Sequence, residues 1–180
     1  ETIDLRDFLV ATCDAMADRA DAKGLRIVIE VAEGELVVVD RQALLTVVRN
    51  LVRNAIEHAV PATLRITGDR RSLSFTDDGP GIGAARLERV FDRHQHGHRV
   101  DEGAARAGDR RRGLGLAIVR RLCDLQGWRI AVRSPAEHGC GTAFVLAFTV
   151  RAPLSEQARA DVDEEGQDGR VEKVREDAVD

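Results

Sequence analysis

Four short motifs in a fixed order constrain this 180-residue chain more than any other feature of its sequence. A predicted helix that carries Asn50, Asn54 and His58 comes first. Asp77-Asp78-Gly79-Pro80-Gly81 and Gly113-Leu114-Gly115-Leu116 follow, and Gly139-Cys140-Gly141-Thr142 is last. Each motif alone is as compatible with an ordinary helix or turn as with a binding site. Together they supply a metal ligand, a carboxylate suited to a base and backbone sites suited to phosphate.

Hydrophobic periodicity predicts helices and strands around these motifs. Residues 4–23 carry apolar side chains at helical spacing, with Asp4 as N-cap and Gly24 at the end. Residues 25–31 alternate as a half-buried strand does. The same patterns predict helices over 40–59, 84–91 and 113–126, and strands over 36–39, 63–67, 73–76, 128–134 and 142–150. In the 113–126 helix we expect the inward-facing side chains to be Leu114, Ile118, Val119, Leu122 and Leu125.

The charge distribution separates a domain from a tail. Residues 151–180 hold five basic and ten acidic side chains, a net charge of −5, whereas the whole chain carries −4. Residues 1–150 are therefore near neutral, which argues against a nucleic-acid partner bound through bulk charge. We predict one domain over 1–150 and an acidic, disordered tail over 151–180.

Other features of the composition exclude further classes of protein. The three cysteines form no Cys-x-x-Cys pair, so neither a zinc site nor a disulfide framework is indicated, and a reducing, cytosolic setting fits. No apolar run approaches the ~20 residues of a membrane span, and no signal peptide is visible. Because residue 1 is Glu rather than Met, we expect the chain to be a piece of a longer protein.

A polar stripe on the 40–59 helix is the first candidate site. Asn50, Asn54 and His58 are four residues apart and share one face of a helix otherwise rich in apolar residues. A carboxamide oxygen is a hard, neutral ligand that suits Mg²⁺, which retains waters and shares phosphate oxygens. For an isolated helix a solvated polar stripe would be the simpler interpretation, but the downstream glycine motifs favour a metal site.

Asp77 and the glycines after it form the second candidate site. Asp77 ends a predicted strand, and its carboxylate is suited to accept a hydrogen bond from an exocyclic amine such as N6 of adenine. Gly79 and Gly81 let the backbone approach a flat base because they have no Cβ. An Asp-Gly turn without a ligand is the alternative interpretation.

The third motif, Gly113-Leu114-Gly115-Leu116, opens a predicted helix whose free N–H groups and dipole favour an anion. A polar loop precedes it and no Gly-Lys-Ser/Thr follows, so it is neither a dinucleotide fingerprint nor a Walker loop. Arg110–Arg112 stand just before it, either as phosphate ligands or as solvated charges. The last motif predicts a tight turn with a hydroxyl donor at Thr142.

The segment 92–112 contains almost no large apolar side chain and predicts a long mobile loop. A loop of this length inside a domain is usually functional or disordered. Its three histidines, His94, His96 and His98, have a spacing that suits a metal in an extended segment. No carboxylate or thiol completes an obvious metal site there, so a metal is the weaker interpretation.

The four motifs in this order resemble the N, G1, G2 and G3 boxes of the ATP-binding catalytic domain of sensor histidine kinases. That domain belongs to the wider ATPase group shared with gyrase, Hsp90 and MutL. Arg89-Val90-Phe91-Asp92-Arg93 resembles the F box, which favours the kinases over the other members. The resemblance covers about residues 1–150. It implies an α+β fold, a two-layer α/β sandwich of the Bergerat type with helices on one face of a mixed sheet.

The resemblance also implies a role for each motif. Asn54 would coordinate Mg²⁺ and serve catalysis, with Asn50 and His58 near the phosphates of ATP, and Asp77 would bind the adenine amine. Residues 92–112 would form a lid over the nucleotide. The other expected nucleotide-binding residues are Gly79, Gly81, Ile82, Arg93, Gly113, Leu114, Gly115, Leu116 and Thr142.

Three positions depart from the family pattern. Arg111 stands where the G2 box usually opens with a glycine, His94 replaces an aromatic residue, and Glu57 sits where a lysine is common. Asn54 and Asp77 are both present, so we expect nucleotide binding to survive these departures.

We therefore expect the Mg-ATP-binding catalytic domain of a two-component sensor kinase, an ATP-dependent phosphotransferase. Its expected partners are the dimerisation and phosphoacceptor helical hairpin of the same kinase and the receiver domain of a response regulator. All five histidines of the chain lie in the ATPase region, so the accepting His is expected elsewhere. The full-length protein would be a homodimer, and this domain would be cytoplasmic, with a membrane anchor outside it left open.

Two alternatives stay open at this point. One is an anti-sigma-factor-type serine kinase, although the F box and the long predicted lid argue against it. The other is a non-catalytic regulatory module that uses ATP to gate contacts, for which the altered opening of the G2 box leaves room.

Overall fold

The computed structural model describes residues 1–59, 61–92, 114–135 and 140–149. The predicted tail and, apart from Asp92, the predicted lid lie outside these residues. The other predictions outside them concern Arg93, His94, His96, His98, Arg110–Arg112, Gly113 and Gly139. The division into a domain and a tail, and the lid, stay predictions.

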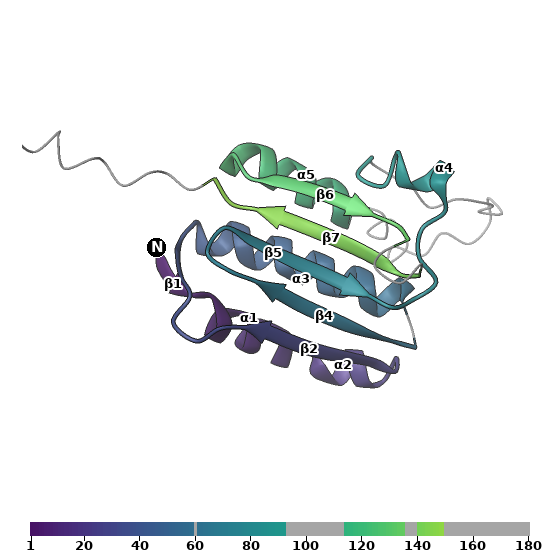
Figure 1. The fold of residues 1–180 in the computed structure, drawn as a ribbon, viewed down its shortest axis with the longest axis horizontal. Helices are drawn as coiled ribbons and strands as arrows, with labels where there is room; N and C mark the ends of the chain where they lie inside the picture. Colours follow the sequence, from purple (N-terminus) through teal and green to yellow (C-terminus); the bar gives the residue numbers. More distant parts are fainter. Residues whose placement is uncertain (60, 93–113, 136–139, 150–180) are drawn as a thin grey trace, which may run out of the picture. The chain divides into compact units, whose positions relative to one another are not determined.

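A mixed five-stranded sheet forms one layer of the fold (Figure 1). Its order is β2-β4-β5-β7-β6; β2 is parallel to β4, and the other neighbours are antiparallel. The strands are β2 (Leu25–Val31), β4 (Ala62–Gly68), β5 (Ser72–Asp77), β6 (Arg129–Arg133) and β7 (Thr142–Ala147). A separate antiparallel pair consists of β1 (Thr2–Asp4) and β3 (Leu36–Val38).

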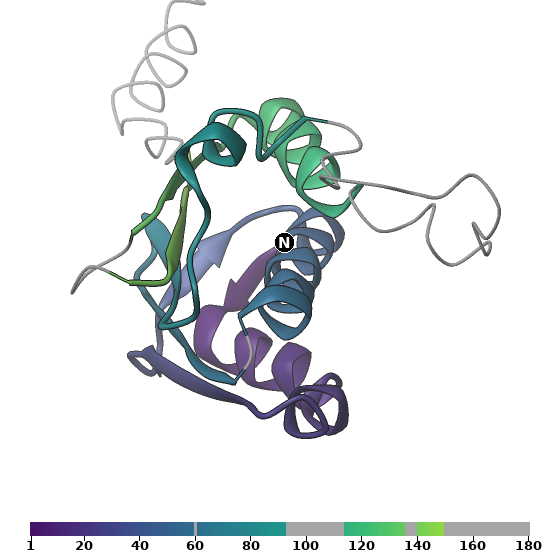
Figure 2. The ribbon, with the colours of Figure 1, turned by 90° about the vertical axis from the view of Figure 1, so that its right-hand side faces the viewer.

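Helices cover one face of the five-stranded sheet (Figure 2). They are α1 (Leu5–Asp14), α2 (Ala17–Asp21), α3 (Arg41–His58) and α5 (Gly115–Gln126), and the short α4 (Ala84–Leu87) follows β5. The long α3 packs against both α1 and α5. This arrangement confirms the predicted α+β fold of two layers with a mixed sheet.

The predicted N-caps explain where the two longest N-terminal helices begin. Asp4 Oδ1 accepts a hydrogen bond from the N–H of Asp7 at 3.1 Å. Asp40 Oδ1 accepts from the N–H groups of Gln42 and Ala43, each at 2.9 Å. These bonds satisfy first-turn donors that have no partner within the helix, which fixes the start of α1 and α3.

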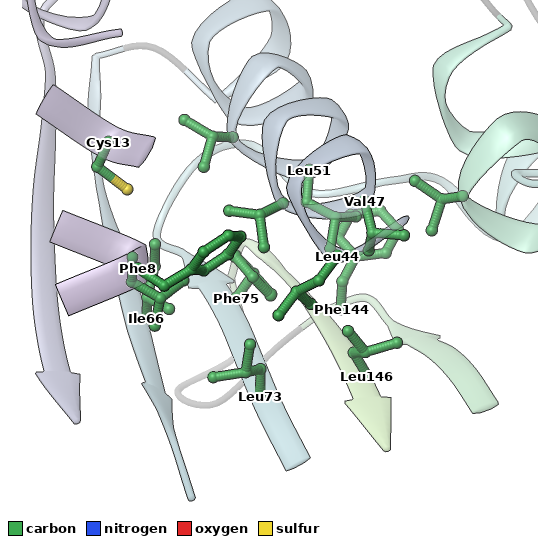
Figure 3. Close-up of a cluster of buried hydrophobic side chains, with 14 of the residues drawn as sticks. Phe8, Cys13, Leu44, Val47, Leu51, Ile66, Leu73, Phe75, Phe144 and Leu146 are labelled. Carbon is green, nitrogen blue, oxygen red and sulfur yellow. The ribbon is translucent and has the colours of Figure 1, made fainter. Parts of the chain in front are cut away.

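The hydrophobic core lies between the helices and the sheet, as Figure 3 shows for α3 above Phe75 and Phe144. Alternate side chains of a strand point to the same face. On β5 the buried series is Leu73, Phe75 and Asp77, and on β7 it is Leu146, Phe144 and Thr142. Strand alternation therefore carries one acidic and one hydroxyl side chain to the helix-covered face, where the two strands meet at Asp77 and Thr142.

Three predictions about helices were wrong in part. The 4–23 helix is broken after Asp14, and the next segment turns so that Met16 and Ala20 are both buried. The 84–91 helix ends at Leu87, because α4 buries no residue that would stabilise a longer helix.

The inward face of α5 was also predicted incorrectly in part. Val119 and Cys123 are fully buried, whereas Ile118 and Leu125 are 42% and 63% exposed. α5 packs on α3 and β6 along a narrow stripe, so apolar residues at the flanks of that stripe stay in solvent.

Candidate functional site

Asp77, the last residue of β5, carries a buried carboxylate of which one oxygen accepts two hydrogen bonds and the other accepts none from the described residues. The residue is 7% exposed. Its Oδ1 accepts hydrogen bonds from the N–H of Gly79 at 3.0 Å and of Thr142 at 3.2 Å. Oδ2 has no hydrogen-bond partner among the described residues. Every fully buried polar side-chain atom of these residues does have a partner, so Oδ2 is not fully buried and solvent reaches it. The fold thus presents one acceptor outward from a fixed carboxylate.

Burial is the main influence on the charge of this carboxylate. Removal from water raises the pKa of Asp77 above 3.8, because the charged form loses solvation. The two backbone hydrogen bonds oppose that rise, and the neighbouring Asp78 adds to it. A poorly solvated acceptor gains more from a new donor than a solvated one does.

The glycines around Asp77 are needed for packing. Gly141 has φ +73°, and a Cβ there would lie 1.8 Å from the carbonyl oxygen of Asp77. Gly81 has φ +77°, and its Cβ would lie 2.8 Å from Ser134 Oγ. A Cβ on Gly79 would lie 2.8 Å from Cα of Ala59, just past the end of α3. Close approach to neighbouring backbone at Gly79 and Gly141, and to the Ser134 side chain at Gly81, therefore explains why glycine stands at these positions, in addition to any approach to a base.

Ser134, which the sequence did not single out, joins the two turns that hold Asp77. Its Oγ accepts a hydrogen bond from the N–H of Ile82 at 2.7 Å and donates to the carbonyl oxygen of Gly141 at 2.9 Å. The first turn supplies the Gly79 donor and the second the Thr142 donor. A lone serine just after a strand gives no sequence signal for such a role, so only the structure reveals it.

In the polar stripe of α3, hydrogen bonds fix the side-chain amide of Asn50, whereas none of the described residues bonds to that of Asn54. Asn50 Nδ2 donates to the carbonyl oxygen of Thr46 at 2.7 Å, and its Oδ1 accepts from Nη2 of Arg53, also at 2.7 Å. The half-buried Asn54 makes no side-chain hydrogen bond with the described residues. Its neutral oxygen fits a hard cation that keeps waters as its other ligands. His58 lies exposed in the last turn of α3.

The structure brings the described parts of all four motifs together. A Cβ on Gly115, at the start of α5, would lie 2.9 Å from both Asn50 Oδ1 and Arg53 Nη2, which joins the first and third motifs. Gly79 against Ala59 joins the first and second, and the register pair Asp77 and Thr142 joins the second and fourth. Leu114 and Leu116 are half-buried at the start of α5, and Ile82 lies in the loop after β5. The predicted site residues Arg93 and Gly113 lie outside the described residues.

Known proteins resemble the chain in both sequence and fold. The family model described as histidine kinase-, DNA gyrase B- and HSP90-like ATPase matches residues 39–155. Sensor protein SphS of Synechococcus elongatus is 33% identical over 141 residues, which are 74% of this chain and 34% of SphS. The chain thus spans about a third of that relative's length.

Solved structures of histidine kinases are similar to the chain in fold. The catalytic domain of histidine kinase ThkA superposes with a TM-score of 0.65 at 22% identity, covering 82% of this chain and 93% of that one. Full-length ShkA in complex with AMPPNP gives a TM-score of 0.61 at 27% identity, covering 86% of this chain and 32% of ShkA. Within the described residues, no helix has both the length and the apolar character that a membrane span requires.

Proposed function

We propose a function from the premise that this chain belongs to the histidine kinase-, DNA gyrase B- and HSP90-like ATPase family and is the catalytic ATPase domain of a sensor histidine kinase. The proposal is that it binds Mg-ATP and presents the γ-phosphoryl group to a histidine on another domain. The observation that carries it is the Asp77 carboxylate, whose Oδ1 accepts hydrogen bonds from two N–H donors and whose Oδ2 has no partner among the described residues.

At the base end, Asp77 Oδ2 would accept a hydrogen bond from N6 of adenine. Guanine carries a carbonyl oxygen at the equivalent position, and two acceptors would face each other. The site should therefore select ATP over GTP. Gly79, Gly81, Ile82 and Thr142 would support the base through the turns that hold Asp77.

At the phosphate end, Asn54 would ligate Mg²⁺, whose charge offsets that of the phosphates. Asn50, His58 and the backbone of Leu114–Leu116 would lie beside them, because α3 and the start of α5 are in contact. Arg93, Gly113 and the 92–112 lid enter the proposal through the family resemblance. Phosphoryl transfer depends mostly on positioning and charge stabilisation, so a site of this kind needs no covalent group of its own.

The accepting side of the reaction is proposed to lie on the dimerisation helical hairpin of the same kinase, in a homodimeric full-length protein. The phosphoryl group would then pass to the receiver domain of a response regulator. Because this step would take place in the cytosol, the ATPase domain would lie there too. SphS, about three times as long as the matched region, leaves room for such a hairpin in a relative of this chain.

Two measurements test the proposal. Calorimetric titration with ATP and GTP, with and without Mg²⁺, should give tighter binding of ATP and a gain from Mg²⁺ that Asn54→Ala loses. The hairpin of the parent kinase, added with labelled ATP, should then gain phosphate that is labile in acid and stable in base. Acid-stable phosphate would instead indicate a serine kinase, and ATP binding with no transfer would indicate a regulatory module. Equal affinity for ATP and GTP would contradict the role of Asp77.

A further inference from the structure

Arg53 is a half-buried cation at the junction of α3 and α5 that the proposed site has not yet used. Its Nη2 donates to Asn50 Oδ1 at 2.7 Å. The same two atoms lie against Gly115, where a Cβ would approach each of them to 2.9 Å. The guanidinium therefore sits between the polar stripe of α3 and the first residue of α5.

The hydrogen bonding of this guanidinium is far from complete. It has five N–H donors, and within the part of the chain that the structure describes only one of them is used, in the bond to Asn50. Within the described residues, Arg53 forms no ion pair with any carboxylate. Glu57, one turn further along α3, is exposed and forms no ion pair with Arg53. A partly buried cation without a counter-ion gains from an anion placed beside it.

The surroundings indicate which anion fits. The N–H groups of the first turn of α5 have no partners within the helix, and no side chain of the described residues caps them. Asn54, whose side chain makes no hydrogen bond with the described residues, follows Arg53 directly on α3. Backbone donors, an open carboxamide and a guanidinium fork together match the oxygens of a polyphosphate.

We propose that Arg53 binds the terminal phosphates of the nucleotide, holding them between α3 and the start of α5 while its bond to Asn50 fixes the first amide of the stripe. This inference rests on the proposed ATP function and names a residue of that site beyond its four motifs. Arg53 would therefore act on the phosphates and have little effect on the base.

The test compares ATP, ADP and AMP on the wild-type domain and on Arg53→Gln, with NMR titration for the weakest affinities. Arg53→Gln should weaken ATP and ADP by about tenfold or more, the loss of a charge-assisted bond, and AMP by less than about twofold. Arg53→Lys keeps the charge but not the planar fork of donors, so its affinities for ATP and ADP should lie between those of wild type and Arg53→Gln. Arg49→Gln is the matched control, since Arg49 is exposed on the preceding turn of the same helix, and it should bind all three as wild type does.

Two results would overturn the inference. An equal loss for ATP, ADP and AMP would mean that Arg53 only maintains the packing of α3 on α5. No loss relative to Arg49→Gln would mean that it makes no phosphate contact. If Arg53→Gln folds poorly, as its melting temperature would reveal, the ATP-to-AMP affinity ratio of Arg53→Lys decides, and an unchanged ratio refutes the contact. The proposed function fails separately, if the wild-type domain does not bind ATP or if Asp77→Asn binds it equally well.

Discussion

Replacing Asp77 with Asn changes one atom at the point where the fold presents its acceptor. The N–H groups of Gly79 and Thr142 both point at Oδ1. In the variant they can be satisfied only if the amide oxygen takes that position. The amide Nδ2 must then occupy the place of Oδ2, so the substitution puts a donor where wild type has an open acceptor.

The magnitude follows from the bond that is lost. A hydrogen bond to a charged group contributes about 1.5–3 kcal/mol, and about 1.4 kcal/mol corresponds to a factor of ten in affinity. Asp77→Asn should therefore weaken ATP binding by roughly 10- to 150-fold. The upper part of this range is expected, because Nδ2 and the N6 amine would face each other as two donors. Selectivity for ATP over GTP should shrink at the same time.

The assay is calorimetric titration of Mg-ATP and Mg-GTP into the isolated domain. Asp78→Asn is the matched control, because it removes the same charge from the next residue, which is exposed and accepts a bond from the N–H of Thr63 through an oxygen that Asn retains. The control should bind ATP within about twofold of wild type. The reasoning is refuted if Asp77→Asn stays within that margin, or if the two variants lose affinity equally.

The same substitution has an opposite effect on the stability of the domain without nucleotide. Burial raises the pKa of Asp77, so the folded state holds its proton to higher pH than the unfolded state does. The stabilising contribution is complete below 3.8, the ordinary value, and is lost as pH rises through the folded pKa. At neutral pH Asp77→Asn should thus unfold at the same or higher urea concentration than wild type. A marked loss of stability at pH 7 would contradict a burial penalty at this residue.

Three further predictions concern the turns and the core. Gly141→Ala should destabilise the domain by about 1–3 kcal/mol more than Gly34→Ala in urea unfolding, since both glycines have nearly the same φ but only the former faces a backbone clash; equal losses would contradict the clash. Ser134→Ala removes two hydrogen bonds and should weaken ATP binding by about 3- to 10-fold, and unchanged affinity would show that the turns hold Asp77 without it. The two buried cysteines, Cys13 and Cys123, whose pKa burial raises to about 11, should resist alkylation at pH 8 until the chain unfolds, while the exposed cysteine before β7 reacts at once; rapid labelling of all three would contradict this burial.

The elements that the sequence predicted well are those whose local signals agree with their packing. The caps at Asp4 and Asp40 and the strand alternation around Phe75 each have a local physical cause that tertiary packing does not override. The predictions failed where packing decides. The exposed Ile118 is an example, because periodicity shows an apolar face but not how wide a stripe the neighbouring elements cover.

The candidate site divides in the same way. The motifs predicted Asp77 and the polar stripe that contains Asn50 as site residues, because a carboxylate or amide in an unusual place is visible in sequence. The sequence did not predict Ser134 or Arg53, because their proposed roles depend on contacts between distant parts of the sequence or on the direction of a side chain. The functions of these residues stay proposals until the affinities above are measured.

The contacts between motifs argue that the two ends of the site are mechanically joined. Gly79 lies so close to Ala59 that a Cβ would not fit, which ties the Asp77 turn to the end of α3. Gly115 lies equally close to the side-chain ends of Asn50 and Arg53, so the start of α5 contacts the middle of the same helix. A close-packed backbone contact such as that of Gly79 with Ala59 transmits a displacement of one segment to the other. A small shift of α3 would therefore move Asp77, the proposed adenine acceptor, together with the proposed phosphate end, so substitutions in the α3 core should change the affinities for AMP and ATP in parallel, unlike Arg53→Gln.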